Sequence, residues 1–307
     1  MDIQINQLTK SYGYQKAVDN ISFSVKTGEV LGFLGPNGAG KTTTMKMITN
    51  YIDIESGDIL IDGQSVKEGA MKKHIGYLPE NNPLYLDMPV IDYLEFCAAL
   101  QGVSKSLVAA RIREMVRLCG LDIEKHKKIG ELSKGYRQRV GLAQAMIHDP
   151  KILILDEPTT GLDPNQIIEI RELIRQMGRQ KTVILSTHIL PEVEATCDRI
   201  LIINRGKIVA DGTASTLRKQ AQGQQVLKLK IEEGETNEIY EKLQSLSSVS
   251  LVDFINADDN RFEVQSHPER QSNKAIFELC VKNNWVLSEM IPFETKLEDI
   301  FRDLTLN

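Results

Sequence analysis

The sequence predicts an α/β protein with an N-terminal antiparallel β region, an inserted helical subdomain and a small α+β domain near the C-terminus. Three observations carry this prediction. Short runs without polar residues, such as VLGFL before Gly35, are typical of strands buried on both faces of a parallel sheet. Helical patterns separate these runs, as in residues 164–177, where isoleucines recur at helical spacing. Beyond residue 225 the patterns follow the order βαββαβ.

The core elements follow from two kinds of apolar pattern. Residues Ile3 to Leu8 and Ile21 to Val25 alternate apolar with polar side chains, which predicts half-buried strands. Glu29 to Leu34, Ile152 to Leu155 and Val183 to Leu185 are nearly continuous apolar runs instead. Because buried strands that alternate with helices form a parallel sheet covered on both faces, we expect that architecture here.

The strand signal disappears between about Pro89 and Leu132, within a helical subdomain expected over about residues 85–135. Two helical patterns, near Val90 to Leu100 and Ser104 to Cys119, replace it, so we expect a helical subdomain inserted into the α/β core. The polar stretch QAQGQQ, residues 220–225, predicts a linker. These features divide the chain into a first domain over residues 1–219 and a second over residues 226–307.

The second domain is predicted to be ferredoxin-like, because its elements follow the order βαββαβ. A final short helix is expected over Leu297 to Leu304, and Trp285 is a candidate anchor of the core. Two roles stay open for this domain: a prop that stabilises a dimer, or a regulatory domain that senses a ligand or a partner. The expected elements before the final helix are Val226–Ile231, Asn237–Leu246, Ser250–Ile255, Arg261–Gln265, Arg270–Val281 and Trp285–Ile291.

Composition is that of a globular protein, with 41% hydrophobic and 26% charged residues. The formal net charge of −5 argues against a nucleic-acid binder, because such proteins are usually strongly basic. No apolar run approaches the ~18 residues needed to cross a bilayer, and the first residues lack a signal-peptide pattern. The cysteines are scattered without a CxxC pair, which favours reduced thiols in a cytoplasmic protein.

The segment GPNGAGKT fits the phosphate-binding pattern GxxxxGK(S/T), after a buried strand and before a helix. Glycines allow the backbone N–H groups to turn inward, where a Cβ would block the phosphates. Lys41 would supply a charge to the β- and γ-phosphates, and Thr42 a hydroxyl to Mg²⁺. The segment therefore predicts a nucleoside triphosphate site. Its candidate residues are Gly35, Pro36, Asn37, Gly38, Ala39, Gly40, Lys41, Thr42 and Thr43.

The run ILILDEP, residues 152–158, adds the catalytic half of the site. Asp156, at the end of a buried strand, is placed to hold Mg²⁺ through its water shell. Glu157 would point at the γ-phosphate as a general base that polarises the attacking water, a role worth roughly 10²–10⁴ in rate. An Asp-Glu pair at a strand end also occurs in solvated turns, but after a phosphate-binding loop it predicts hydrolysis.

A second anion site is predicted in LSKGYRQR, residues 132–139. Ser133 is a good N-cap for the helical pattern over residues 137–147. Its hydroxyl, the backbone N–H groups of Lys134 and Gly135 and the helix N-terminus can bind a phosphate together. Because one phosphate-binding loop holds only one γ-phosphate, this second site is best explained if it serves the nucleotide of a partner.

Over about residues 1–215 the chain resembles the nucleotide-binding domains of ATP-binding-cassette (ABC) proteins. LSKGY corresponds to that family's signature sequence, usually LSGGQ. The resemblance implies that Asp163, in GLDP, touches the opposite subunit and that Tyr12 stacks on adenine. It also implies that His188 contacts the γ-phosphate and holds the attacking water. Glu80 stands where the family usually has Gln, and its carboxylate can contact Mg²⁺ or its water.

The resemblance implies an ATP-hydrolysing motor subunit of an ABC transporter. Two chains would close over two ATP molecules, and a separate permease would contact the helical subdomain and hold the chain at the inner face of the cell membrane. The finer resemblance is to the ATPases of multidrug-type exporters. On the stretch PENNPLYLDMPV and the C-terminal domain, it is to the gliding-motility-associated (GldA-type) ATP-binding subunits.

The alternative is a soluble cassette ATPase that acts on ribosomes or DNA. Translation-factor cassettes usually carry two such domains in one chain, and DNA-repair versions insert a long coiled coil. Neither feature occurs in this sequence, so a transporter subunit is favoured. The transported substrate is invisible here, because the permease would recognise it.

Overall fold

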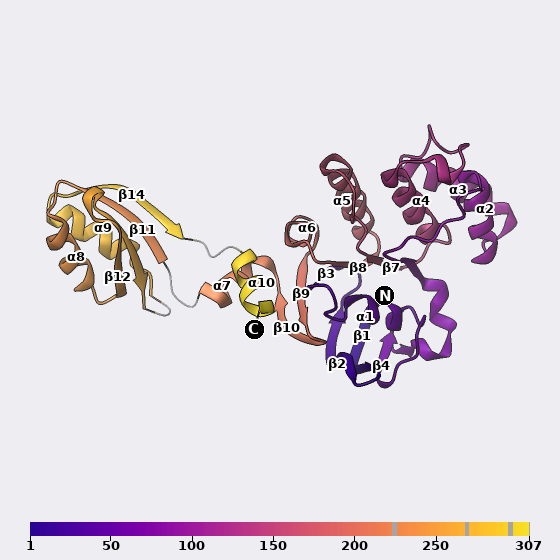
Figure 1. Ribbon diagram of the computed structural model, residues 1–307, viewed down its shortest axis with the longest axis horizontal. Helices are drawn as coiled ribbons and strands as arrows, with labels where there is room; N and C mark the ends of the chain where they lie inside the picture. The colour runs from indigo at the N-terminus through magenta and orange to yellow at the C-terminus, as the bar shows by residue number, and fades with distance from the viewer. Residues whose placement is uncertain (223–225, 268–269, 294–296, 307) are drawn as a thin grey trace. The chain divides into compact units, whose positions relative to one another are not determined.

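A computed structural model describes residues 1–222, 226–267, 270–293 and 297–306. The chain divides into two compact units (Figure 1). The first comprises Met1–Ala214 with the last residues from Leu304 onward, and the second comprises Ser215–Asp303. Within the described residues, none of the helices combines the length and the apolar character that crossing a membrane requires.

A six-stranded sheet of order β10-β9-β3-β8-β7-β6 forms the centre of the first unit. All its neighbouring strands pair in parallel except β10, which is antiparallel to β9. The predicted apolar runs form β3, β7 and β8, in which every residue is buried, so the predicted parallel sheet is confirmed. The strands are β3 (Val30–Leu34), β6 (Ile75–Leu78), β7 (Ile152–Asp156), β8 (Thr182–Thr187), β9 (Arg199–Asn204) and β10 (Lys207–Gly212).

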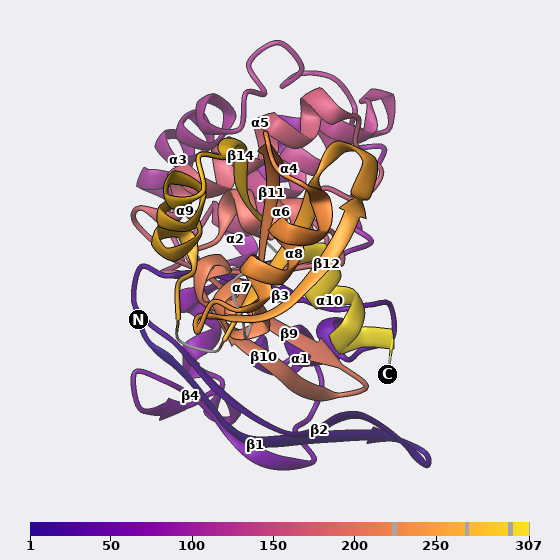
Figure 2. The same ribbon diagram turned by 90° about the vertical axis from the view of Figure 1, so that its left-hand side faces the viewer.

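An antiparallel sheet of order β2-β1-β4-β5 forms the predicted N-terminal β region, in which β1, β2 and β4 run side by side (Figures 1 and 2). Its apolar face packs with α1 (Lys41–Ile48) and with Ile152 and Ile154 of the parallel sheet. The first strand continues past the predicted end at Leu8 to Tyr12, before a turn at Gly13. The strands are β1 (Ile3–Tyr12), β2 (Gln15–Val25), β4 (Ser56–Ile61) and β5 (Gln64–Ser65).

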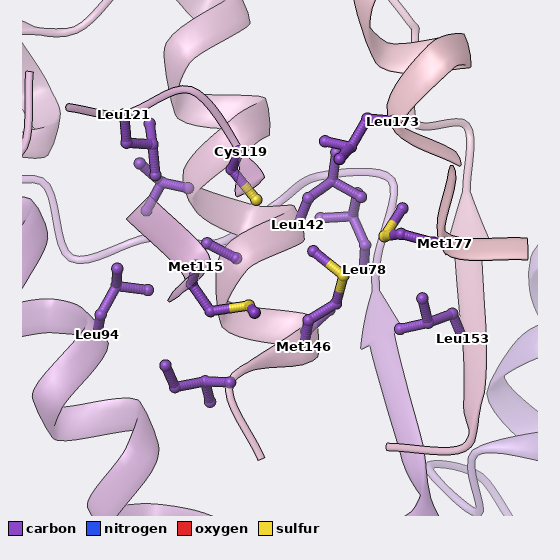
Figure 3. Packing of buried hydrophobic residues seen from close by; sticks show 14 of the residues in the cluster. Leu78, Leu94, Met115, Cys119, Leu121, Leu142, Met146, Leu153, Leu173 and Met177 are labelled. Atoms are coloured by element: carbon purple, nitrogen blue, oxygen red, sulfur yellow. The ribbon is translucent and has the colours of Figure 1, made fainter. Parts of the chain in front are cut away.

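The predicted helical subdomain lies between β6 and β7. Leu94, Met115 and Met146, one from each of three helices, point into one core (Figure 3). The same core takes in Leu153 of the parallel sheet and Met177 of α5, so the subdomain packs against one face of that sheet. The first unit's other helices are α2 (Val90–Leu100), α3 (Lys105–Leu118), α4 (Lys134–Met146), α5 (Pro164–Gly178), α6 (Leu190–Thr196), η1 (Val66–Glu68), η2 (Ala70–His74) and η3 (Ile129–Glu131).

The second unit contains the predicted βαββαβ domain, with an antiparallel sheet of order β12-β13-β11-β14. The domain's first and third strands are central, as in a ferredoxin-like fold. Trp285 is only 8% exposed and packs in its core. The elements are α7 (Ala214–Gln222), β11 (Val226–Glu232), α8 (Thr236–Gln244), β12 (Val249–Asn256), η4 (Ala257–Asp259), β13 (Arg261–Ser266), α9 (Asn273–Lys282), β14 (Val286–Phe293) and α10 (Leu297–Leu306).

Two predicted boundaries in this region are wrong. Residues 220–222 of the expected linker are helical and end α7, because glutamine and alanine favour a helix and the breaker Gly223 comes only afterwards. Residues 223–225 of that linker lie outside the described residues. Helix α9 begins at Asn273 rather than Arg270, because the Ser272 hydroxyl bonds the Ser266 hydroxyl (2.7 Å) and the Ser248 carbonyl (3.1 Å), outside the helix.

The chain returns to the first unit at its end. Asn204, buried at the end of β9, donates from Nδ2 to the carbonyl oxygens of Leu304 (3.1 Å) and Thr305 (3.4 Å). These carbonyls belong to the last turn of α10, where a helix leaves its carbonyls without intrahelical partners. Two residues after Asn204, the Gly206 N–H donates to the carbonyl of Ala39 (3.0 Å). One turn therefore supports both the phosphate-binding loop and the end of the chain.

Candidate nucleotide-binding site

A cavity of about 490 Å³ opens where the phosphate-binding loop follows β3. This is the carboxyl edge of the parallel sheet, where α/β proteins bind their ligands. The cavity brings together five separately predicted parts of the site: Tyr12, the loop, Glu80, Glu157 and His188. Its lining consists of Tyr12, Gln15, Ala17, Asn37, Gly38, Gly40, Lys41, Thr42, Thr43, Glu80, Glu157, Thr160 and His188.

Two glycines of the loop are required by close packing. A Cβ on Gly35 would lie 2.4 Å from the carbonyl oxygen of Ile203, and one on Gly40 would lie 2.2 Å from that of Ala17. We predicted that the glycines let the phosphates approach, but at Gly35 and Gly40 the carbonyl oxygens of the protein's own backbone exclude a Cβ. Gly38 has a φ of +78° and open space around a Cβ, so phosphate approach and the positive φ remain the reasons for glycine there.

Lys41 begins α1 and directs its charge into the loop. Its side chain is 6% exposed, and Nζ donates to the carbonyls of Gly35 (2.8 Å) and Pro36 (3.2 Å). Gly35, Pro36 and Ala39 do not line the cavity themselves, so their part is to shape the loop. The α1 N-terminus and the Lys41 ammonium together present positive charge to the cavity.

Asp156 is fully buried, and only one of its two carboxylate oxygens accepts a hydrogen bond from the described residues. Its Oδ1 accepts a hydrogen bond from the Ser186 hydroxyl (2.8 Å), whereas Oδ2 has no hydrogen-bond partner among the described residues. Burial raises the pKa of Asp156, the hydroxyls of Ser186 and Thr42 oppose this shift, and the nearby charges of Glu80 and Glu157 add to it. An orphaned buried carboxylate oxygen beside the Thr42 hydroxyl fits a hydrated cation, which supplies the missing positive charge.

A divalent cation would find only part of its coordination shell in the protein. No group of three or more His, Cys, Asp or Glu side chains in the described part of the chain could hold a metal by itself. Mg²⁺ usually keeps several waters and binds through one or two carboxylates and substrate phosphates. The residues Thr42, Glu80 and Asp156 fit that mode of binding.

Glu157 and His188 are in direct contact. His188 Nδ1 lies 3.0 Å from Oε1 and 2.9 Å from Oε2 of Glu157. An ionised carboxylate only accepts hydrogen bonds, so Nδ1 carries the proton. Thr160 also donates to Glu157 Oε2 (3.2 Å). Glu157 is 5% exposed, whereas the His188 side chain is 42% exposed, so the histidine forms the outer side of the pair.

Tyr12 and Glu80 lie at the rim. Tyr12 is 55% exposed and ends β1, where the turn at Gly13 leaves its ring beside the cavity. Glu80 is exposed and lines both this cavity and a second one of about 590 Å³. The second cavity reaches the N-terminus of α4 and includes Lys134. Glu80 thus stands between the nucleotide cavity and the signature region.

The predicted second anion site lies outside the nucleotide cavity of this chain. Ser133, Lys134, Gly135 and Asp163 do not line that cavity. Ser133 caps α4 as predicted, accepting from the Tyr136 N–H (3.3 Å), but α4 already begins at Lys134 rather than at residue 137. The Lys134 ammonium lies against Gly161, 2.0 Å from where a Cβ would stand. Asp163 caps α5 in a capping box with Gln166.

Several site residues were not predicted from the sequence. Gln15, Ala17 and Thr160 line the cavity, the Ser186 hydroxyl donates to Asp156, and the Thr187 hydroxyl lies 3.5 Å from Oε2 of Glu157. The polar pair that ends the apolar run VILST was an available signal, because such residues lie at the carboxyl edge of the sheet beside Asp156. Gln15 and Ala17 reach the cavity through the turn that returns β2 along β1, and the register of this pairing could not be predicted from the sequence.

Comparisons with known proteins agree with this geometry. The ABC transporter family model matches residues 18–160. The chain is 34% identical to the bacitracin transport ATP-binding protein BcrA of Bacillus licheniformis, over 97% of this chain and 95% of that protein. It is 33% identical to the linearmycin resistance ATP-binding protein LnrL of Bacillus subtilis, over 99% of this chain and 98% of that protein. The fold is similar to the solved structure of cbiO1 from Clostridium perfringens, which is part of the ABC transporter complex cbiONQ. The two match over 72% of this chain and 91% of the cbiO1 chain, with 29% sequence identity and a TM-score of 0.65.

Fold and site together define a P-loop ATPase of the α/β class. The chain belongs to the ATP-binding proteins of ABC transporters, and it is an ATPase of the ABC type. The prediction of an ABC transporter ATP-binding subunit is therefore confirmed, and it is favoured over a cassette ATPase that acts on ribosomes or DNA.

Proposed function

We propose that the chain is the motor of an exporter and works as a homodimer. Each ATP lies between the phosphate-binding loop of one copy and Ser133 to Gly135 of the other. The observation that carries this proposal is the exposed N-terminus of α4, where Ser133 and Lys134 lie outside the nucleotide cavity of their own chain. A helix N-terminus with exposed N–H groups is an anion site, and a partner's γ-phosphate supplies the anion.

Glu157 is the general base in this proposal, and His188 orients it. The Nδ1 proton of His188 bridges both oxygens of Glu157, so the carboxylate keeps one orientation and accepts a proton from the attacking water. Lys41 binds the β- and γ-phosphates, and Tyr12 stacks on the adenine. Thr42, Glu80 and Asp156 would hold Mg²⁺, which neutralises phosphate charge when bound.

A separate permease is the proposed membrane partner, with the chain held at the inner face of the cell membrane. The names of BcrA and LnrL, a transport and a resistance protein, support an exporter. The helical subdomain offers the permease a cluster of exposed aromatic side chains, in which the Tyr85 ring lies 5.6 Å from that of Phe96. We propose the first unit as the ATP-binding domain and the second as an accessory domain. A role in gliding motility rests on the motif resemblance alone.

Gel filtration of Glu157→Gln tests the dimer. With millimolar ATP and Mg²⁺, this variant should elute as a dimer, because it binds ATP and cannot hydrolyse it. Adding Ser133→Ala should weaken the dimer, since the hydroxyl reaches the partner's phosphate. The single Ser133→Ala variant, checked by thermal unfolding, controls for loss of the α4 cap. A Glu157→Gln variant that binds ATP and stays monomeric at every protein concentration would refute the shared site.

A further inference from the structure

Glu192 is a buried carboxylate close to the site. It lies in α6 and is 1% exposed. Its Oε1 accepts from the Thr159 hydroxyl (2.5 Å) and its Oε2 accepts from the Thr187 hydroxyl (2.9 Å). Burying a carboxylate is costly unless its oxygens are hydrogen-bonded, so these two hydroxyls hold Glu192 in place. Glu192 in turn fixes both threonines.

The two threonines belong to the two segments that carry the catalytic pair. Thr159 follows Glu157 by two residues, and Thr187 directly precedes His188. The φ of Glu157 is +51°, a conformation that a residue with a side chain keeps only when its surroundings enforce it. The Glu157 N–H donates to the Ser186 carbonyl (2.9 Å). The Glu192 carboxylate ties the same two segments together, two residues after Glu157 in one and one residue after Ser186 in the other.

The Thr187 hydroxyl lies between two carboxylates. It is 2.9 Å from Oε2 of Glu192 and 3.5 Å from Oε2 of Glu157. A hydroxyl has a single proton, so it can donate to only one of them, and the shorter contact assigns the proton to Glu192. Its lone pair accepts the N–H of Ile189 (3.1 Å), which fixes the oxygen. Oε2 of Glu157 already accepts from Thr160 and His188.

We propose that Glu192 is a positioning residue for ATP hydrolysis. It holds the Thr187 proton away from Glu157, so that a lone pair on Oε2 stays open to the attacking water. It also fixes the spacing of Glu157 and His188 by clamping Thr159 and Thr187. This inference rests on the proposed roles of Glu157 and His188 and adds a residue that does not line the nucleotide cavity.

The variant Glu192→Gln keeps the shape of the side chain and replaces one carboxylate oxygen, an acceptor, with an amide nitrogen, a donor. The amide oxygen stays with Thr159, which makes the shorter bond, so the amide nitrogen faces Thr187. The Thr187 hydroxyl must then accept, and its proton turns to Glu157. We expect kcat to fall about tenfold, part of what a general base contributes, with an unchanged KM for ATP. Thr187→Ser keeps the hydroxyl and should retain activity.

The double variant separates positioning from mere stability. Thr187→Val removes the misdirected proton, so Glu192→Gln should cause no further loss of kcat in that background. Two results would overturn the proposal and leave Glu192 with a structural role only. One is that the losses of kcat multiply in the double variant. The other is that Glu192→Gln raises KM and lowers the unfolding temperature together. Glu157→Gln is measured beside them. If it hydrolyses ATP as the unmodified protein does, the proposed base is wrong, which is a distinct result.

Discussion

Lys41 Nζ lies 3.5 Å from Oε1 of Glu157, and both side chains are only 6% exposed. The cation of the phosphate-binding loop and the proposed general base therefore neutralise each other inside the site. Removing one partner of a buried ion pair destabilises the folded protein, because the other charge stays buried without compensation. ATP has to compete with Glu157 for the same ammonium.

Lys41→Met should weaken ATP binding more than tenfold, since a charge-assisted contact to phosphate is lost. It should also destabilise the protein by about 3 kcal/mol, the cost of an unpaired buried charge. Isothermal titration with ATP and chemical unfolding measure the two effects. Lys67→Met, at an exposed position, is the matched control. Unchanged ATP affinity in Lys41→Met would contradict the assignment of the loop.

Asp156→Asn should abolish ATP hydrolysis and increase the stability of the folded protein. Burial raises the pKa of Asp156, so the folded protein binds more protons at this group than the unfolded chain does. Stability then falls as the pH rises through the ordinary carboxyl range up to the folded-state pKa, and the loss persists above it. The uncharged Asn avoids this loss.

The asparagine variant should therefore unfold at a higher temperature than the unmodified protein at pH 7, by a few degrees. The difference should shrink as the pH is lowered, because Asp156 itself becomes protonated. Hydrolysis should be lost at every pH, because the amide is a poorer Mg²⁺ ligand. Thermal unfolding from about pH 4, within the ordinary carboxyl range, up to about pH 8 measures the trend, and a difference that grows toward low pH would have the wrong sign.

The phosphate-binding loop and Asp156-Glu157 were predictable because their chemistry is contiguous in the sequence. The parallel sheet was predictable as well, since strands buried on both faces leave no polar alternation. Glu192 was not, because its partners Thr159 and Thr187 meet it only after β7 and β8 pair and α6 folds back. The end of α7 was missed because a polar stretch of good helix formers resembles a linker when composition alone is weighed.

Gly35 and Gly38 should respond differently to alanine. At Gly35 the new Cβ would meet the Ile203 carbonyl oxygen at 2.4 Å and the side chains of Ile203 and Ala39 at 2.9 and 3.2 Å, so a loss of about 1–3 kcal/mol is expected. At Gly38 only the positive φ is strained, at about 1 kcal/mol, while the Cβ points into open space. Gly38→Ala should fold and bind ATP weakly. Equal unfolding midpoints for the two variants would contradict this account.

Asn204 should couple the end of the chain to the phosphate-binding loop. Asn204→Ala removes the donor to the Leu304 and Thr305 carbonyls and should cost about 1–2 kcal/mol. Asn204→Asp, of the same shape, should cost more, because an acceptor then faces two carbonyl oxygens. Limited proteolysis of the last turn of α10 and ATP titration measure both consequences. Because Gly206 supports Ala39, we expect weaker ATP binding to accompany faster cleavage. Faster cleavage with unchanged ATP affinity would show that the turn after Asn204 does not transmit the effect to the loop.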